Sequence, residues 1–268
     1  YFSLFLYNKD KLQGGEKMKQ KKKKLNIQKI LFFILLIVIM AISSIIVLKN
    51  SKEDIEEEKI IEQVIETAYQ KNSTEDLEEE HSNINIKNLY EQNKDIIAWI
   101  RINNSNINYP IMQTLNNPNF YLRKNFYKQY SYYGTPYLSE QCDINTSDNL
   151  IVYGHHIKNS KMFGELENYK RQEYYNNHKN INIYTQNDER NYEIIYVFKA
   201  IINNGFDYYN YINFNSESEF NTFKNKCKEL AFFDTQIDCN YKDKFITLST
   251  CDYTSQNARL VVVAKRLS

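Results

Sequence analysis

The C-terminal part of the chain contains the stretch that decides the fold, Lys244-Phe-Ile-Thr-Leu-Ser-Thr-Cys251. Its apolar and polar residues alternate, and it is rich in β-branched and aromatic types, which predicts a β-strand that ends on Cys251. Eight residues later Arg259 opens a second predicted strand, Arg259-Leu-Val-Val-Val-Ala-Lys-Arg266. A strand–loop–strand of this kind would set the thiol and the guanidinium side by side at one end of a sheet.

A third predicted strand lies far upstream and ends in two histidines, Asn149-Leu-Ile-Val-Tyr-Gly-His155-His156. Cys, His and Arg side chains at strand ends can together build a thiol acyl-transfer site. Adjacent side chains in an extended chain point in opposite directions, so only one of the two histidines should face Cys251. The remaining histidines, His81 and His178, lie in polar segments and are expected to be solvated.

From about residue 96 onward the sequence consists of short β-type runs separated by Asn-rich turns. Many short strands with few helices predict a barrel or a sandwich. Two helices are expected among them, one over 163–176 and one over 216–231 that begins with a capping box of Ser216 and Glu219. The predicted strands are 97–102, 107–112, 149–153, 181–185, 192–202, 244–251 and 259–266.

An uninterrupted stretch without charge runs from Ile30 to Leu48. As a helix it would cover about 28 Å, close to the hydrocarbon thickness of a bilayer. Lysines are concentrated in residues 17–29, and acidic residues dominate 53–80. The positive-inside rule therefore puts the N-terminus in the cytoplasm and the part of the chain after the apolar stretch outside. A cleaved signal peptide is the alternative, but its apolar region should span only about 7–15 residues. We therefore expect an uncleaved membrane anchor.

The first methionine of the chain is Met18, and Gly14-Gly-Glu-Lys-Met18 could be encoded by a ribosome-binding sequence placed before a start codon. We therefore expect translation to start at Met18, the alternative being that the preceding segment is genuine. The stripe Ile60, Ile61, Val64, Ile65 and Ala68 predicts a helix in the acidic segment, followed by a loop at 74–85. The predicted parts are a basic tail at 1–29 (with 1–17 as upstream sequence), an anchor at 30–48, an acidic helical stalk at 49–87 and a catalytic domain at 88–268.

Charge and cysteine content narrow the classes of function. The net charge of +1 gives no bulk electrostatic case for binding nucleic acid. Four cysteines outside the cytoplasm could pair as two disulfides; Cys227 lies on the apolar face of a predicted helix, whereas Cys142 and Cys239 cannot be assigned. The sequence contains no Cys-x-x-Cys and no His-Glu-x-x-His, which argues against zinc.

The run Thr-Leu-Ser-Thr-Cys251, followed by Arg259 at the head of a Val-rich strand and preceded by Tyr-Gly-His155, resembles the sortases, and in its details class B. The resemblance covers roughly residues 88 to 268. It implies a mainly β fold, a closed sortase-type barrel of about eight strands with N-terminal helices and an extra helix before the cysteine-bearing strand. The further segments that carry it are Ile97–Ile102, Tyr109–Ile111, Phe120–Leu122, Gly134–Leu138 and Met162–Gly164.

The resemblance also implies a function. It indicates a membrane-anchored cysteine transpeptidase that cuts a C-terminal sorting signal of surface proteins after threonine and passes the acyl group from Cys251 to a peptidoglycan amine. His155, the histidine directly after the glycine, would be the general acid and base, and Arg259 would donate hydrogen bonds to the oxyanion or the substrate backbone. The enzyme would lie in the cell membrane, cross it once and face the wall.

Four further residues are expected to contact substrate. Ser249 shares a strand face with Cys251, whereas Tyr211, Ile212 and Leu122 match segments that line the substrate groove in class B sortases. No metal or organic cofactor is needed, and no acidic cluster indicates a calcium site. Two alternatives stay open: a thiol endopeptidase that releases its product by hydrolysis at the same site, and a catalytically silent surface scaffold on the same barrel.

Overall fold

The computed structural model describes residues 2–69, 84–203, 205–255 and 257–267. They form two compact units, Tyr1–Glu56 and Glu57–Ser268, which we describe separately. The loop predicted at 74–85 lies almost entirely outside the described residues.

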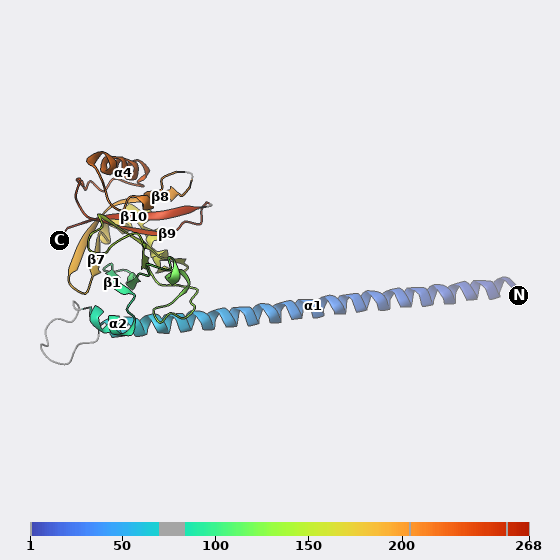
Figure 1. The fold of residues 1–268 in the computed structure, drawn as a ribbon. Coiled ribbons are helices and arrows are strands. Elements are labelled where there is room, and N and C mark those ends of the chain that lie inside the picture. Colours follow the sequence, from blue (N-terminus) through green and yellow to red (C-terminus); the bar gives the residue numbers. More distant parts are fainter. Residues whose placement is uncertain (1, 70–83, 204, 256, 268) are drawn as a thin grey trace. The chain divides into compact units, whose positions relative to one another are not determined.

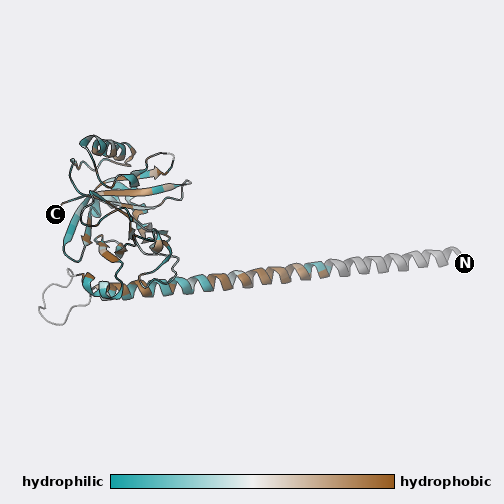
Figure 2. Ribbon diagram, in the orientation of Figure 1, coloured by the Kyte–Doolittle hydropathy of each residue, from teal (hydrophilic) through white to brown (hydrophobic). Residues whose placement is uncertain are grey.

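The first unit is the N-terminal part of a single long helix, α1 (Phe2–Tyr69). By length and composition, this is the one helix within the described ranges that could cross a membrane. The side chains between Ile30 and Leu48 are exposed, and Figure 2 shows this stretch as a continuous apolar band. An exposed apolar surface of this size fits a membrane anchor.

The second unit is built on a closed β-barrel with the strand order β1-β2-β3-β4-β9-β10-β8-β7 (Figure 1). Neighbours β2 and β3, and β4 and β9, run parallel, while the other neighbouring pairs run antiparallel. The strands are β1 (Ile96–Arg101), β2 (Asn108–Met112), β3 (Tyr137–Leu138), β4 (Asn149–Tyr153), β7 (Asn180–Tyr184), β8 (Glu189–Ile201), β9 (Phe245–Cys251) and β10 (Ala258–Arg266). The predicted closed, mainly β barrel is confirmed.

Each of the seven predicted strands is present to within a few residues, because each is long enough to show an apolar pattern. No strand is predicted at β3, which has two residues and forms only three paired positions with its neighbours. A separate two-stranded sheet, β5 (His156–Ile157) and β6 (Lys161–Met162), begins with the second of the two adjacent histidines.

The helices agree less closely with prediction. The segment expected as one helix over 163–176 is a 3₁₀ helix, η2 (Phe163–Lys170), followed by α3 (Gln172–Asn177). The helix before the cysteine-bearing strand is α4 (Glu217–Leu230), with the Ser216 hydroxyl accepting the Glu219 N–H at 3.2 Å. The remaining elements of this unit are α2 (Ile86–Gln92), η1 (Phe120–Arg123) and η3 (Tyr208–Asn210).

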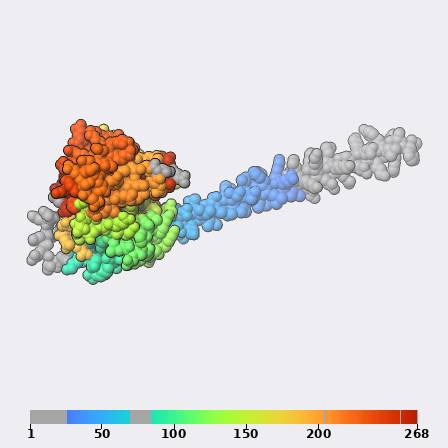
Figure 3. Space-filling model, turned by 45° about the horizontal axis from the view of Figure 1, so that its top comes forward, coloured from blue at the N-terminus to red at the C-terminus, as the bar shows by residue number. Residues whose placement is uncertain are grey.

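The barrel core is centred on β10, where Leu260 to Ala264 are fully buried. The close packing of the unit is visible in Figure 3, in which the orange and red C-terminal residues cover one face beside green residues from the middle of the chain. Strands β9 and β10, which carry the predicted Cys251 and Arg259, therefore belong to the closely packed core.

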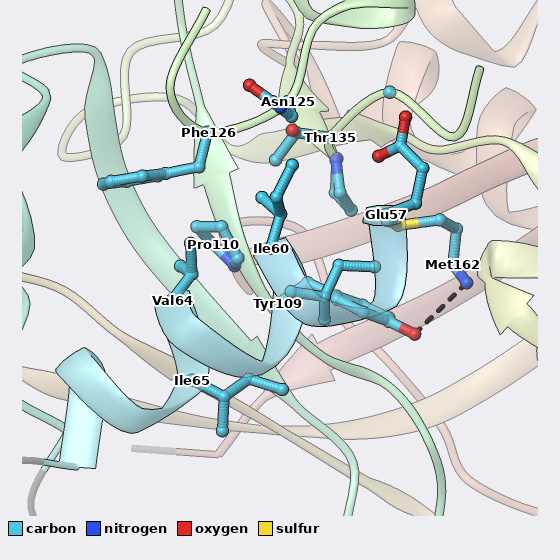
Figure 4. A pocket seen from close by; sticks show the side chains of 13 residues that line it. Glu57, Ile60, Val64, Ile65, Tyr109, Pro110, Asn125, Phe126, Thr135 and Met162 are labelled. Carbon is cyan, nitrogen blue, oxygen red and sulfur yellow. Dashed lines mark hydrogen bonds between the residues drawn. The ribbon is translucent and has the colours of Figure 1, made fainter. Parts of the chain in front are cut away.

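A second apolar cluster includes the end of α1, which the sequence assigned to the stalk. Val64 and Ala68 are 2% and 0% exposed and pack in one cluster with Trp99 and Phe126. Figure 4 shows Val64 and its neighbours on the helix facing Tyr109 and Phe126 across a small apolar groove. The compact unit thus begins at Glu57.

Candidate active site

The site is organised by strand β9, which lies between β4 and β10. Cys251, the last residue of β9, pairs with Arg259 on antiparallel β10. Directly paired residues on neighbouring strands project to the same face of the sheet. The thiol and the guanidinium therefore stand on one face at one end of the sheet, at the two ends of the loop that joins β9 to β10.

His155 follows the end of β4, the strand on the other side of β9. Parallel strand β4 pairs Tyr153 with Ser249, and the Gly154 N–H continues the ladder by donating to the Ser249 carbonyl at 3.1 Å. In the sequence, His155 comes two residues after Tyr153, as Cys251 comes two residues after Ser249. Gly154 permits this path because a Cβ there would lie 2.6 Å from the Phe163 ring.

The His155 ring is oriented by a backbone carbonyl. Its Nε2 lies 2.7 Å from the Leu122 oxygen, and since a carbonyl only accepts, Nε2 carries the proton. In the neutral ring this leaves Nδ1 as the proton acceptor. Burial lowers the pKa of His155, and the nearby charge of Arg123 lowers it further, against the opposing effect of the Leu122 hydrogen bond. The neutral form, a base, is therefore favoured near pH 7.

His156 takes a different place from its neighbour. Its Nδ1 donates to the backbone carbonyl of Cys251 at 2.9 Å, and its ring lies 5.0 Å from that of Tyr253. The two adjacent histidines thus have different partners, His155 the carbonyl of Leu122 and His156 the backbone of the cysteine itself. His156 is suited to holding the end of β9 in place.

All four cysteines lie in the described part of the chain, and none is in a disulfide. Cys142, Cys227 and Cys239 are buried, and burial raises the pKa of each thiol, that of Cys142 to about 11. Cys251 is the partly exposed one. Because a cysteine must be both accessible and ionised to attack a substrate, the three buried thiols are chemically inert by comparison.

Three tyrosines surround the site on the face that Cys251 and Arg259 share. Tyr137 pairs with Tyr153 across β3 and β4, and their rings lie 5.5 Å apart. The Tyr208 hydroxyl lies 2.6 Å from the Ser249 Oγ, and burial, partly offset by that bond and by the charge of Arg259, raises the pKa of Tyr208 to about 12. These hydroxyls stay protonated and can act as hydrogen-bond donors.

The half-buried Arg259 has one hydrogen bond that fixes its head group, from Nη1 to the Ala258 carbonyl at 3.0 Å. Its charge acts on the hydroxyls of Tyr137 and Tyr208, which places the guanidinium among them. A planar guanidinium has five N–H donors, so it can bind an oxygen of a ligand while it keeps this backbone bond.

The four predicted substrate contacts have different surroundings. Ser249 is 1% exposed and its hydroxyl is paired with Tyr208. Ile212 is also buried, and the carbonyls of Tyr211 and Ile212 accept hydrogen bonds from Asn149, at the far end of β9 from the thiol. The Leu122 side chain is 37% exposed, while its carbonyl holds His155.

The sequence does not predict an ion pair at Asp252, the residue that follows Cys251. Asp252 is 3% exposed, with Lys170 Nζ 2.8 Å from its Oδ2 and the Thr254 N–H 2.9 Å from its Oδ1. Burial alone would raise the pKa of Asp252, but the hydrogen bonds from Lys170 and Thr254 lower it to about 2. The carboxylate anchors the loop between β9 and β10. The Asp-x-Thr turn is visible in the sequence, whereas the partner Lys170 is not.

No group of three or more His, Cys, Asp or Glu side chains lies in a position to hold a metal ion, as far as the described residues extend. Cys251 and Arg259 are paired at the ends of β9 and β10, and His155 follows the adjacent strand β4. A partly exposed thiol, an imidazole and a guanidinium are the groups that a thiol acyl-transfer enzyme uses, and here they are carried by a closed β-barrel.

Comparison with known proteins identifies the family. The family model for the sortase domain matches residues 100–267, and the chain belongs to the sortase family. Sortase B from Staphylococcus aureus is 31% identical over 189 residues, which cover 69% of this chain and 76% of that protein. The predicted resemblance to class B sortases is thereby confirmed.

Solved structures support the same assignment. The structure of Clostridium perfringens sortase B is similar with a TM-score of 0.64 and 29% identity, covering 69% of this chain and all of that one. Sortase B from Bacillus anthracis, in complex with the compound AAEK1, gives a TM-score of 0.68 at 26% identity, covering 80% of this chain and 98% of that one. The chain is thus a sortase, of the cysteine transpeptidase type, with sortase B proteins as its relatives.

Proposed function

We propose that this sortase cleaves a C-terminal sorting signal of surface proteins after threonine, and that it transfers the new acyl end from Cys251 to an amine of peptidoglycan. The observation that carries the proposal is the pairing of Cys251 with Arg259 on β10, together with the parallel pairing of β9 with β4, the strand that His155 follows. We infer that the His155 imidazole and the Arg259 guanidinium act on this partly exposed thiol.

The first half-reaction forms a thioester. Cys251 gives its proton to the Nδ1 of His155, and the thiolate sulfur attacks the carbonyl carbon of the substrate threonine. The carbonyl oxygen becomes an oxyanion in the tetrahedral intermediate. When the carbon–nitrogen bond breaks, the leaving amine takes the proton back from His155, since an unprotonated amine is a poor leaving group.

The second half-reaction regenerates the thiolate. A neutral acceptor amine attacks the thioester carbon and gives its proton to His155. The carbon–sulfur bond then breaks, and an amide between the surface protein and the wall remains. The low pKa of His155, caused mainly by burial, suits this role because the ring is ready to accept a proton near pH 7.

Arg259 would stabilise the oxyanion or the substrate backbone. Its guanidinium is held by the Ala258 carbonyl before any ligand arrives, so little ordering remains at the moment of reaction. The rigid fork of donors also binds peptide carbonyls in a way that a lysine cannot reproduce.

The donor peptide would lie along the segment 206–214. This segment runs from Tyr208, bonded to Ser249 near the thiol, to Ile212, bonded to Asn149 at the other end of β9. Ser249, Tyr211, Ile212 and Leu122 are the substrate contacts that we propose along and beside it.

The apolar part of α1, residues 30–48, would anchor the enzyme in the cell membrane as a single span. The lysines at 17–29 favour a cytoplasmic N-terminus, and the catalytic domain would then face the wall outside the cell. An enzyme that joins proteins to wall precursors has to act at that surface.

The full chain in detergent micelles provides the test. It would be incubated with fluorescent sorting-signal peptides, with and without an amine acceptor, and the products read by mass spectrometry. Cleavage after threonine with amine-dependent ligation is expected. Acid product alone, at every acceptor tried, would identify a thiol hydrolase, and a folded chain that cleaves nothing would favour a silent scaffold.

A further inference from the structure

An exposed aromatic and basic surface lies beside the proposed catalytic histidine. We call it the acceptor surface and define it by Arg123, Tyr132, His156 and Tyr253. Tyr132 and Tyr253 are 60% and 73% exposed, which is unusual for two large aromatic side chains so close to a thiol.

Tyr253 is fixed on this surface through His156. Its hydroxyl donates to the His156 carbonyl at 3.2 Å, and the two rings lie 5.0 Å apart. His156 in turn donates from Nδ1 to the Cys251 carbonyl at 2.9 Å. His156 is thus bonded to the Cys251 backbone, and Tyr253 is bonded to His156. A large part of the Tyr253 side chain stays exposed to solvent.

Arg123 and Tyr132 come from the segment that holds His155. The Arg123 Nη1 donates to the Tyr132 carbonyl at 3.1 Å, and its Cζ lies 5.3 Å from the centre of the Tyr132 ring. The preceding residue, Leu122, supplies the carbonyl that orients His155. The backbone bond takes one of the five N–H groups of the guanidinium, so further donors remain for a ligand oxygen.

Electrostatic interactions tie the two halves of the surface together. The charge of Arg123 acts both on the His155 imidazole and on the Tyr253 hydroxyl. Tyr253 also interacts with Cys251 and with Tyr132. Arg123 therefore lies near the His155 imidazole, and Tyr253 lies near the Cys251 thiol.

We propose that this surface binds the second substrate, a peptidoglycan stem peptide that carries the acceptor amine and a free carboxylate; the inference rests on the proposed function. Because His155 has to take the proton of the acceptor amine, the amine must approach from the side on which His155 lies. The rest of the acceptor then passes over the adjacent surface. Arg123 would bind its carboxylate, and the tyrosine rings would pack on its aliphatic parts.

The charge of Arg123 would also help the chemistry. A cation close to the incoming amine disfavours the ammonium form, so more of the bound acceptor is neutral and nucleophilic. The other conceivable occupant is the leaving segment of the sorting signal, which departs from the same carbon. If that segment occupied the surface, the variants would raise the KM of the donor peptide and leave the product ratio unchanged.

The test uses the full chain in detergent micelles with a sorting-signal peptide that the wild-type protein cleaves. The probe is a synthetic stem tetrapeptide with a free side-chain amine and a C-terminal carboxylate, compared with its C-terminal carboxamide. For Arg123→Gln and for Tyr253→Ala, the acceptor concentration at half-maximal ligation should rise about tenfold, and the ratio of ligated to hydrolysed product should fall.

Three comparisons make the result specific. The wild-type protein should prefer the carboxylate over the carboxamide, Arg123→Gln should lose that preference, and Arg123→Lys should regain part of it. Tyr130→Ala is the matched control, since Tyr130 is 72% exposed on the same segment but is not part of the acceptor surface. The ratio of ligated to hydrolysed product in this variant should equal that of the wild type. Thermal melts establish that each variant is folded.

Two results would overturn the inference alone: an unchanged product ratio in both variants, or a rise in the KM of the donor peptide with an unchanged ratio, which would assign the surface to the leaving segment. A wild-type protein that forms no thioester and ligates no amine would overturn the proposed function, and this inference with it.

Discussion

Two pairs of tyrosines around the site have opposite environments, and we call them the buried side and the exposed side of the site. On one side Tyr137 and Tyr208 are 7% and 1% exposed, and their hydroxyls are bonded to neighbouring side chains. On the other side Tyr132 and Tyr253 are 60% and 73% exposed. The first pair is part of the folded core, and the second pair is surface.

This difference suggests how one thiol handles two substrates. Buried, hydrogen-bonded rings hold a single geometry, which suits the selection of one donor sequence. Exposed rings can move between rotamers and adapt to their ligand. We therefore expect strict recognition of the sorting signal on the buried side and a broader tolerance for amine acceptors on the exposed side.

The largest effect is expected from removing the thiol that both sides share. Cys251→Ala should lower peptide cleavage by at least on the order of 10⁴-fold, because no other group in the site can form the thioester. A continuous fluorescence assay measures the rate. Cys239→Ala, which removes a buried thiol, is the control and should retain cleavage. Undiminished cleavage by Cys251→Ala would rule out the mechanism.

The next largest effect concerns the guanidinium. Arg259→Lys should lower kcat/KM by about 100-fold, since a lysine keeps the charge but loses the planar pair of donors. Steady-state kinetics with the donor peptide provide the measurement. The exposed Arg171→Lys serves as control. A near-native rate in Arg259→Lys would demote Arg259 to a structural role.

A smaller effect should appear in the pH dependence of stability. The pKa of Asp252 is about 2 in the folded chain, below its usual value near 3.9. The stabilisation of the folded state by this carboxylate is therefore fully present above about pH 4 and is lost as the pH falls toward 2. The shift corresponds to about 2 kcal/mol.

Urea unfolding of the wild type and of Asp252→Asn between pH 6 and pH 2 measures this contribution. The difference in stability between the two proteins should shrink by about 2 kcal/mol over the lower part of that range. Asp238→Asn, at an exposed carboxylate, is the comparison variant. A difference that stays constant with pH would mean that the ion pair with Lys170 does not stabilise the loop.

The smallest effect sharpens the comparison of the two sides directly. Tyr208→Phe leaves the buried Ser249 hydroxyl without its partner and should cost about 1–2 kcal/mol in unfolding free energy. Tyr132→Phe, at an exposed ring, should cost less than about 0.5 kcal/mol. Equal costs, read from urea midpoints, would contradict the contrast between a buried and an exposed side.

The sequence predicts those features of the structure that depend on residues close together in the chain. Strand β9 and strand β10 could be predicted because each shows its own apolar pattern. The placement of Cys251 beside Arg259 follows from the short loop that joins the two strands. Residues that act through distant partners could not be predicted. Tyr208 meets Ser249 only through the fold, and Lys170 meets Asp252 from a 3₁₀ helix that the sequence indicated only as a mixed helical pattern.

The end of helix α1 illustrates the same limit. The stripe Ile60, Ile61, Val64, Ile65 and Ala68 predicts a helix, and α1 covers these residues. A stripe does not say whether the helix spaces the domain or packs against it, and Val64 and Ala68 join the cluster around Trp99. The short strand β3 shows no pattern in the sequence that would predict it, although it closes the barrel between β2 and β4.

The most direct test of the central claim is the mass of the intact protein after a quenched reaction with a sorting-signal peptide. The account predicts one covalent adduct, equal in mass to the acyl part that ends in threonine, located on Cys251 by peptide mapping and removed by an amine acceptor. An adduct on Cys142, Cys227 or Cys239, or cleavage with no adduct at any time point, would contradict it.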